Sequence, residues 1–217
     1  SLFSAFYSIL ASMNGQHETA IIAIFIGMIA DMLDGRVARL TNTQSEFGAQ
    51  FDSLSDMVTF GVAPSLIAYS WALSSLGKIG WLICFSYTAS VALRLARFNT
   101  QQESSDIKYF IGLPCPPAAG VICGLIWFLS SWNIGGHSIY VAIPLGLVVF
   151  LCAALMVSNI AFYSFKDIDF KGKVPFISVV LTCLVFVAIA AYPAMVLFLS
   201  FSTYALSGPL LALKNLR

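Results

Sequence analysis

Four aspartates lie close together in the segment DMLDGRVARLTNTQSEFGAQFDSLSD, residues 31–56, of a chain that is otherwise strongly apolar. They are Asp31, Asp34, Asp52 and Asp56, and the whole sequence contains only 10 acidic residues. Burying an unpaired carboxylate is costly, and four neighbouring carboxylates also repel one another unless cations lie among them. Oxygen ligands without His or Cys suit Mg²⁺, Mn²⁺ or Ca²⁺ rather than zinc. The segment therefore predicts a site for a hard divalent cation.

The spacing of these aspartates allows all four to meet. Asp31 and Asp34 are three residues apart, and Asp52 and Asp56 are four apart, so each pair lies on one face of a helix. The polar residues 41–44, TNTQ, let the second helix fold back against the first. Two metal ions held about 4 Å apart by such carboxylates form a clamp for phosphoryl transfer.

Residues beside the aspartates suit a phosphate-bearing ligand. Gly35 and Ala38 lack bulk, so a nucleotide could approach the first helix closely, and Gly48 offers the same clearance on the second. Arg39 is one helical turn beyond Gly35, where its guanidinium could pair with a phosphate. The segment thus combines a predicted metal site with space for a nucleotide.

The elements that position these residues are membrane helices. Hydrophobic residues make up 59% and charged residues 10% of the 217 residues, and the mean hydropathy is +0.88. Soluble domains carry about 25% charged residues. Residues 109–165 and 174–213 contain no charged side chain, and each run is long enough for two spans of roughly 20 residues. The net charge of +1 gives no argument for nucleic acid. No linker divides the chain, so we expect one membrane domain, residues 1–217, with its catalytic motif at 31–56.

Breaks in the apolar pattern predict an all-α integral membrane protein, a bundle of about eight transmembrane helices. The chain begins at Ser1 without Met, and we expect a truncated first helix that ends in SMNGQHE. The second, third and fourth helices are expected at about 19–40, 45–73 and 79–98, and the fifth from about Pro116. SSWNIGGHS, then KDIDFKGK at 166–173, then Tyr192-Pro193 are the expected breaks before the sixth, seventh and eighth helices.

With this number of helices, nearly all basic residues fall on the same side of the membrane. Ten of the eleven fall on one side of the predicted bundle, and only Lys78 falls on the other. Basic residues favour the cytoplasmic side of a membrane. We therefore expect both termini and the aspartates to be cytoplasmic. The ten residues are Arg36, Arg39, Arg94, Arg97, Lys108, Lys166, Lys171, Lys173, Lys214 and Arg217.

The spaced pattern within residues 31–56 resembles the signature of the CDP-alcohol phosphotransferases. It reads Asp31-x2-Asp34-Gly35-x2-Ala38-Arg39-x8-Gly48-x3-Asp52-x3-Asp56. The resemblance implies an integral membrane enzyme that displaces CMP from a CDP-linked alcohol, with a dinuclear divalent metal site and a homodimeric assembly.

The same resemblance implies a role for each residue of the motif. Asp31, Asp34 and Asp52 would be metal ligands, and Asp56 would be the general base that also touches a metal. The implied CDP-binding residues are Gly35, Ala38, Arg39, Ser45 and Gly48.

Three further stretches resemble the phosphatidylserine synthase branch of this family, including its bacterial members. They are RLARFN at 94–99, GLPCPPAAG at 112–120 and SFKDIDFKGKVPF at 164–176; Cys115 and Pro117 depart slightly from the expected spelling. The branch implies CDP-diacylglycerol as donor, L-serine as acceptor and CMP as product. The similarity to bacterial members implies a bacterial inner membrane location with membrane lipid around the helices, and the segregation of basic residues predicts that the active site faces the cytoplasm.

Two interpretations remain for Arg94 and Arg97. They could bind the serine carboxylate or a lipid phosphate, or they could be long side chains that anchor the helix at the membrane surface. Asn99 is equally open. Lys166, Lys171 and Lys173 are more typical of a membrane-surface patch than of a site.

Two alternative functions follow from the same residues. Intramembrane aspartates also mark cation transporters, although such sites usually lie near the bilayer midplane rather than beside arginines at one end. Within the enzyme class, the acceptor could instead be glycerol phosphate or inositol phosphate, which should require more basic residues near the cleft. The five cysteines fall singly in mostly apolar sequence and are interpreted as small buried hydrophobic residues.

Overall fold

The computed structural model describes residues 1–41, 45–101, 109–136, 138–163 and 176–215. The first half of the chain forms α1 (Leu2–Met13), α2 (His17–Leu40), α3 (Glu46–Asp56), the π-helix η1 (Met57–Val62), α4 (Ala63–Trp71), the 3₁₀-helix η2 (Leu73–Leu76) and α5 (Lys78–Gln101). The second half forms β1 (Tyr109–Ile111), α6 (Cys115–Ser131), α7 (Ile139–Val157), β2 (Ala161–Tyr163), α8 (Phe176–Ala191) and α9 (Pro193–Asn215).

The predicted helical architecture is confirmed in the described part of the chain. Because α3, η1 and α4 follow one another without a gap, they form one rod, and the long helical segments then number eight. The predicted break at Tyr192-Pro193 falls between α8 and α9, and α6 begins one residue before Pro116. Proline has no backbone N–H to continue a preceding helix, so a helix tends to end before it. The same residue is tolerated in the first turn of a new helix, where that N–H would have no partner within the helix.

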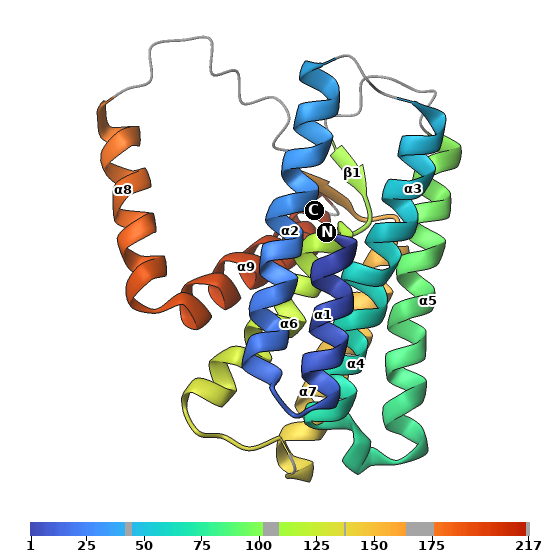
Figure 1. The fold of residues 1–217 in the computed structure, drawn as a ribbon, viewed down its shortest axis with the longest axis vertical. Coiled ribbons are helices and arrows are strands. Elements are labelled where there is room, and N and C mark those ends of the chain that lie inside the picture. Colours follow the sequence, from blue (N-terminus) through green and yellow to red (C-terminus); the bar gives the residue numbers. More distant parts are fainter. Residues whose placement is uncertain (42–44, 102–108, 137, 164–175, 216–217) are drawn as a thin grey trace.

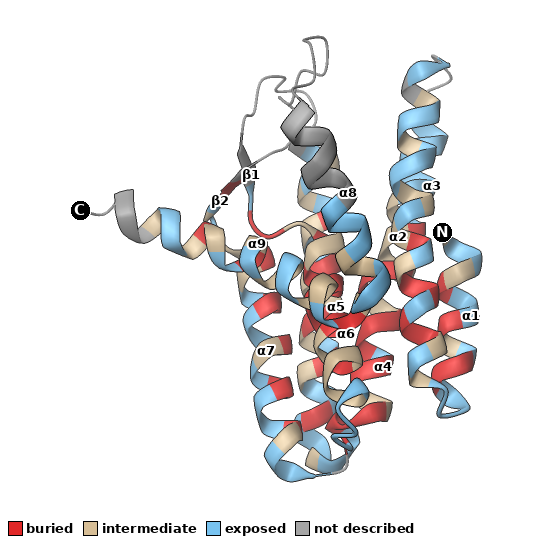
Figure 2. Cartoon of the chain, turned by 90° about the vertical axis from the view of Figure 1, so that its left-hand side faces the viewer, coloured by how far each residue is buried: buried red, intermediate tan, exposed pale blue. Residues whose placement is uncertain are grey.

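Most of these helices pack as a bundle around an apolar core (Figure 1). The largest fully buried side chains include Tyr87, Phe60, Ile21 and Ile122, which come from α5, η1, α2 and α6. Figure 2 shows that the buried residues gather inside this bundle, whereas α3 is mostly exposed beyond it. The packing of α4 in the core therefore sets the rotation and the axial position of the continuous helical rod from α3 to α4.

The outer surface of the bundle is also apolar. Large side chains such as Phe85 on α5 and Leu147 on α7 are more than half exposed. Among the described helices, α5, α7 and α9 contain stretches long and apolar enough to cross a membrane, at 78–100, 139–157 and 193–212. Exposed apolar surface of this extent is stable in contact with lipid rather than water. The protein is an integral membrane protein.

The ends of the bundle carry different charges. The C-terminal ends of α2 and α5 and the start of α3 lie at the same end, whereas the turns from α1 to α2 and from α4 to α5 lie at the other (Figure 1). Arg36, Arg94 and Arg97 belong to the last turns of α2 and α5, and Lys78 begins α5 at the opposite end. This arrangement agrees with the predicted segregation of the basic residues that the structure describes.

A pair of short strands corrects the expected boundary of the sixth helix. We expected this helix to continue to KDIDFKGK, but α7 ends at Val157, and β2 then pairs antiparallel with β1, with Phe110 opposite Phe162. Residues 166–173 themselves lie outside the described residues. The strands were not predictable because three-residue segments show no measurable periodicity.

The turn after β1 explains part of the GLPCPPAAG stretch on physical grounds. Gly112 has a φ of +80°, and a Cβ placed there would lie 2.3 Å from the carbonyl oxygen of Met156. The Gly112 N–H donates to the Ile160 carbonyl at 2.8 Å, and the Leu113 N–H donates to the Leu155 carbonyl at 3.0 Å. Only glycine fits this conformation and this approach without strain. The stretch thus fastens the start of α6 to the end of α7.

Candidate active site

The structure brings together three of the four aspartates. Asp31 on α2 and Asp52 and Asp56 on α3 each offer a carboxylate oxygen, and these atoms all lie within 4.8 Å of one another. Asp52 and Asp56 share a face because four residues separate them in a helix. The two elements meet at this level because α2 also contacts η1, which follows Asp56 directly. The predicted meeting of the two helices at their carboxylates is therefore observed.

Asp34 is not part of this tight group. Three residues turn an α-helix by about 300° and advance it by about 4.5 Å, so Asp34 is offset from Asp31 around and along α2. Its side chain is exposed, but it is close enough for its charge to act on the other three aspartates. The site is thus built from three carboxylates with a fourth negative charge at its edge.

The carboxylate groups fit a divalent cation. Asp31 and Asp56 are half-buried, and the Oδ1 atom of Asp56 is buried without a hydrogen-bond partner among the described residues. Such an oxygen costs free energy unless something outside the chain satisfies it. Oxygen donors alone, at this separation, are the ligand set of a hard cation such as Mg²⁺ or Mn²⁺. The described residues therefore fit the metal predicted from the sequence.

The start of α3 gives two of the predicted nucleotide-site residues a local structural role. Ser45 is the N-cap of α3, and its Oγ accepts a hydrogen bond from the Gly48 N–H at 3.0 Å. A Cβ on Gly48 would lie 3.1 Å from that same Oγ, so the absence of a side chain accommodates the cap. Such caps stabilise a helix by ~1 kcal/mol. Ser45 and Gly48 thus fix where α3 begins, two turns before Asp52.

The other predicted nucleotide-site residues lie on the last turns of α2. Gly35 and Ala38 are half-buried, near the end of the helix that carries Asp31. The side chain of Arg39 lies outside the described part of the chain. These positions place two small residues on the same helix as Asp31, and the clearance for a nucleotide remains a prediction.

The structure distinguishes the three candidate acceptor-binding residues. Arg97 donates from Nη2 to the Asn159 side-chain oxygen at 2.9 Å, and Asn99 donates from Nδ2 to the Ser53 hydroxyl at 3.1 Å. Arg94 contacts the Cys115 sulfur through Nη1 at 3.4 Å, while its Nε is buried and has no hydrogen-bond partner in the described residues. Cys115 is close enough for the charges of both Arg94 and Asp56 to act on it. Of the three, Arg94 is the residue whose donor is left unsatisfied by the described part of the chain.

Sequence reasoning missed the partners of these residues. Ser53 ties α3 to α5 through Asn99, and Asn159 ties the end of α7 to α5 through Arg97. Each pair is separated by 46 or 62 residues, and no local pattern relates its members. Polar residues in an apolar sequence are a general signal for such contacts, but the signal does not identify the partner.

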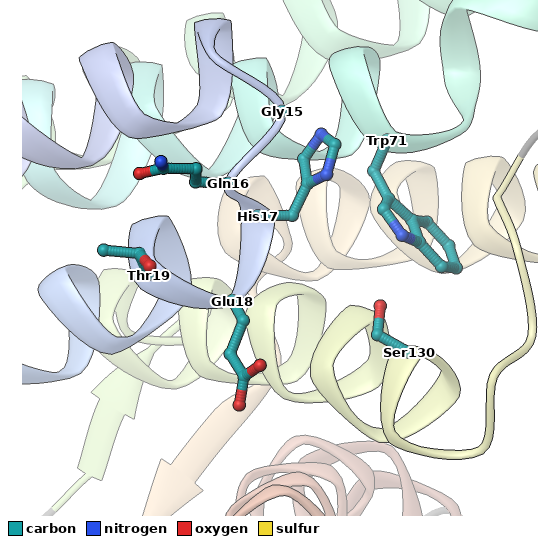
Figure 3. A pocket seen from close by; sticks show the side chains of 7 residues that line it. All are labelled: Gly15, Gln16, His17, Glu18, Thr19, Trp71 and Ser130. Atoms are coloured by element: carbon teal, nitrogen blue, oxygen red, sulfur yellow. The ribbon is translucent and has the colours of Figure 1, made fainter.

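A separate polar pocket of about 480 Å³ lies at the opposite end of the bundle, around the turn from α1 to α2 (Figure 3). Its walls include His17, Glu18 and Trp71. His17 Nε2 lies 3.2 Å from the Ser70 hydroxyl, and the Trp127 indole N–H donates to Glu18 at 3.1 Å. These side chains already interact within the chain and are far from the aspartates, so we do not assign the chemistry to this pocket.

An apolar groove lies between α6 and α9. It measures about 640 Å³ and is lined mainly by α9, with Pro117 contributed by α6. Tyr204 is one of its lining residues, and the charge of Arg94 acts on Tyr204. The groove therefore lies near Arg94.

Comparison with known families agrees with this site. The model of the CDP-alcohol phosphatidyltransferase family matches residues 1–157, which include the three clustered aspartates and Arg94. The chain belongs to the CDP-alcohol phosphatidyltransferase family.

Several characterised relatives share most of the chain. It is 39% identical over 188 residues to a CDP-diacylglycerol–serine O-phosphatidyltransferase from Helicobacter pylori strain J99, which covers 86% of this chain and 78% of the relative. Relatives with the same name come from Bacillus subtilis, at 41% identity over 69% of this chain and 77% of the relative, and from Methanocaldococcus jannaschii, at 37% over 84% and 80%.

Proposed function

We propose that this protein transfers the phosphatidyl group of CDP-diacylglycerol to L-serine, releasing CMP and forming phosphatidylserine. The relatives that share this name span most of the chain at 37–41% identity. The observation that carries the proposal is the group of three carboxylates within 4.8 Å, one of which has a buried oxygen that no described residue satisfies. A site of this composition, beside small residues on α2, suits a metal-dependent reaction at a diphosphate.

Asp31, Asp52 and Asp56 are the residues that would hold the metal, with Asp34 adding negative charge or a further ligand. We assign two ions, Mg²⁺ or Mn²⁺, because the charge of four neighbouring carboxylates exceeds that of one divalent ion. When bound, such ions neutralise the charge that develops on the departing nucleotide phosphate. The chain's own contribution is to carry the carboxylates on two packed helices, which hold them at a fixed separation from one another.

Asp56 is the proposed general base. A serine hydroxyl is a weak nucleophile near neutral pH and needs a proton acceptor as it attacks phosphorus. Asp56 is the carboxylate nearest the packed core, next to η1, and its Oδ1 lacks a partner in the described residues. The Asp56 carboxylate accepts the hydroxyl proton, and the serine oxygen forms a bond to the lipid-linked phosphorus while the bond to CMP breaks.

The nucleotide half of the donor lies along α2 and the start of α3 in this proposal. Gly35 and Ala38 leave room for the cytidine, Arg39 pairs with a phosphate, and Ser45 and Gly48 shape the entrance. The lipid half lies in the apolar groove beside Pro117 and Tyr204 in this proposal, because the groove volume of about 640 Å³ is suited to part of an acyl chain.

Arg94 is the proposed binding residue for the serine carboxylate. Its Nε is a buried donor without a partner among the described residues, and a guanidinium matches the geometry of a carboxylate. Arg97 and Asn99 have partners within the protein and act by holding α5 to α7 and α3. An acceptor that carries a phosphate, such as glycerol phosphate or inositol phosphate, brings more negative charge and would be expected to need further basic groups.

The setting of the reaction follows from the charge pattern. We propose one membrane domain in a bacterial inner membrane, with both termini and the aspartates on the cytoplasmic side. The described arginines lie at the same end of the bundle as the aspartates, and basic residues favour the cytoplasmic side. A homodimer, as the family resemblance implies, is part of the proposal.

An acceptor panel tests the proposed function. The purified protein is supplied with CDP-diacylglycerol and Mg²⁺ or Mn²⁺, and CMP release is compared with L-serine, glycerol phosphate, inositol phosphate and no acceptor. We expect release with serine at a rate well above the others. Faster release with a phosphorylated acceptor would reassign the substrate, and the absence of CMP release with every acceptor would favour the cation transporter.

A further inference from the structure

The rod that carries Asp52 and Asp56 changes its helical geometry directly after Asp56. Residues Met57–Val62 form the π-helix η1 between two ordinary α-helices. A π-turn holds one residue more than an α-turn, so it rotates everything before it by about 100° relative to an uninterrupted α-helix. The direction in which Asp52 and Asp56 point therefore depends on whether this turn is kept.

The second half of the rod fixes its rotation in the bundle. Ala63, Ile67 and Ala68 on α4 are 0% exposed, so α4 cannot turn about its axis without disrupting the core. With α4 fixed, the geometry of η1 sets the rotation of α3, and the hydrogen bond between Asn99 on α5 and Ser53 holds α3 in that rotation. The meeting of Asp56 with Asp31 on α2 is thus a consequence of the π-turn.

Side chains of α5 hold this turn from the other side. The Tyr87 hydroxyl donates to the carbonyl oxygen of Phe60, within η1, at 2.8 Å, and both residues are 0% exposed. The Thr88 hydroxyl is closest to the Ser65 hydroxyl on α4 and to the Cys84 carbonyl, both at 3.0 Å, and lies 3.5 Å from the Gly61 carbonyl. A Cβ on Gly61 would lie 3.2 Å from Val91, so η1 packs closely against α5. In an apolar interior each backbone carbonyl needs a donor, so a hydroxyl aimed at one carbonyl favours the backbone geometry that presents it.

We propose that Tyr87 is a positioning residue for the reaction: by donating its hydroxyl to the Phe60 carbonyl, it keeps the π-turn that aims Asp56 at Asp31. Phe60 is one helical turn from Asp56, so the held carbonyl and the carboxylate belong to the same stretch of backbone. Tyr87 itself lies in the core and contacts no substrate. The proposal rests on the role of Asp56 proposed above, and it adds a residue that acts through it.

The variant Tyr87→Phe removes the hydroxyl and keeps the ring that fills the core. We expect kcat for serine-dependent CMP release to fall about tenfold, since small misplacements of a reacting group cost up to ~10²-fold. At saturating metal, the KM for CDP-diacylglycerol should change much less than kcat, because the proposed nucleotide-facing residues Gly35 and Ala38 lie on α2, whereas the metal concentration needed for half-maximal activity should rise, because Asp52 moves with α3. The matched control is Ser90→Ala on the same helix, whose hydroxyl donates to the Ser86 carbonyl within α5 and whose loss should leave kcat unchanged.

A double variant separates positioning from a general structural effect. If Tyr87 acts mainly through Asp56, adding Tyr87→Phe to Asp56→Asn at saturating metal should lower kcat less than about threefold further, because the base is already gone and only the aim of Asp52 is still disturbed. An equal tenfold loss in both backgrounds, or a wild-type kcat for Tyr87→Phe, would overturn the proposal. Should Tyr87→Phe not yield folded protein, Gly61→Ala perturbs the same turn, because its Cβ would lie 3.2 Å from Val91, and should lower kcat about threefold; unchanged kcat in that variant would also overturn the proposal.

Wild-type protein measured in parallel distinguishes the two levels of inference. Absence of serine-dependent CMP release by the wild type contradicts the proposed function. Normal release by the wild type together with additive variants contradicts only the role of Tyr87.

Discussion

The substitution Asp56→Asn tests the assignment of the base. It keeps the size of the side chain and its position next to η1, and it removes the proton acceptor. Loss of a general base lowers turnover by about 10² to 10⁴. The lower bound corresponds to about 2.7 kcal/mol of transition-state stabilisation, since each tenfold change in rate equals about 1.4 kcal/mol.

The structure indicates that binding should survive this substitution. Asp31 and Asp52 remain as carboxylate donors within the group, and the amide oxygen of Asn can still contact a cation. The nucleotide-facing residues on α2 are unchanged. We therefore expect CDP-diacylglycerol to bind in the presence of metal with an affinity near that of the wild type, while kcat falls by at least ~10².

The assay measures both quantities on one preparation. Equilibrium binding of CDP-diacylglycerol with Mn²⁺ reports the ground state, and CMP release at saturating serine reports kcat. Glu46→Gln is the matched control, because it also converts a carboxylate to an amide on an exposed position of α3. Turnover near the wild-type rate in Asp56→Asn would place the base elsewhere, and loss of CDP-diacylglycerol binding would make Asp56 chiefly a metal ligand.

Three further outcomes follow from the site. Excess chelator should abolish turnover and added Mg²⁺ or Mn²⁺ should restore it; full activity in chelator would contradict the metal assignment. Gly35→Leu should prevent CDP binding by filling the clearance on α2, while the protein still inserts and folds; unchanged CDP affinity would show that α2 does not face the nucleotide there. Arg94→Gln should raise the KM for serine at least about tenfold, the lower range for losing a charged hydrogen bond, with little change in CDP affinity; Arg97→Gln, whose residue is tied to Asn159, should raise it much less.

Much of the helical architecture and the composition of the site could be predicted from the sequence. Prolines and polar breaks mark the starts of α6 and α9 because they act locally on the backbone. The aspartates were identifiable because carboxylates are rare in apolar sequence and need a partner there. Spacing along one helix also predicted that Asp52 and Asp56 share a face.

The remaining features depend on rotation about helix axes and on contacts between distant segments. Spacing did not separate Asp34 from the tight group, because the angle at which α2 faces α3 is set by packing. The π-turn after Asp56 is not encoded by any local signal in MVTFGV, and the hydrogen bond that Tyr87 makes to it spans 27 residues. The pairing of β1 with β2 similarly joins segments about 50 residues apart.

The most direct test of the central claim is the stoichiometry of the purified enzyme acting on CDP-diacylglycerol with metal, with and without L-serine. Direct attack by serine, assisted by Asp56, predicts one CMP released for each phosphatidylserine formed, and no CMP burst before serine is added. CMP released in amounts equal to the enzyme without serine would indicate a covalent phosphatidyl-enzyme and contradict direct attack. CMP released without any phosphatidylserine product would contradict the assignment of serine as the acceptor.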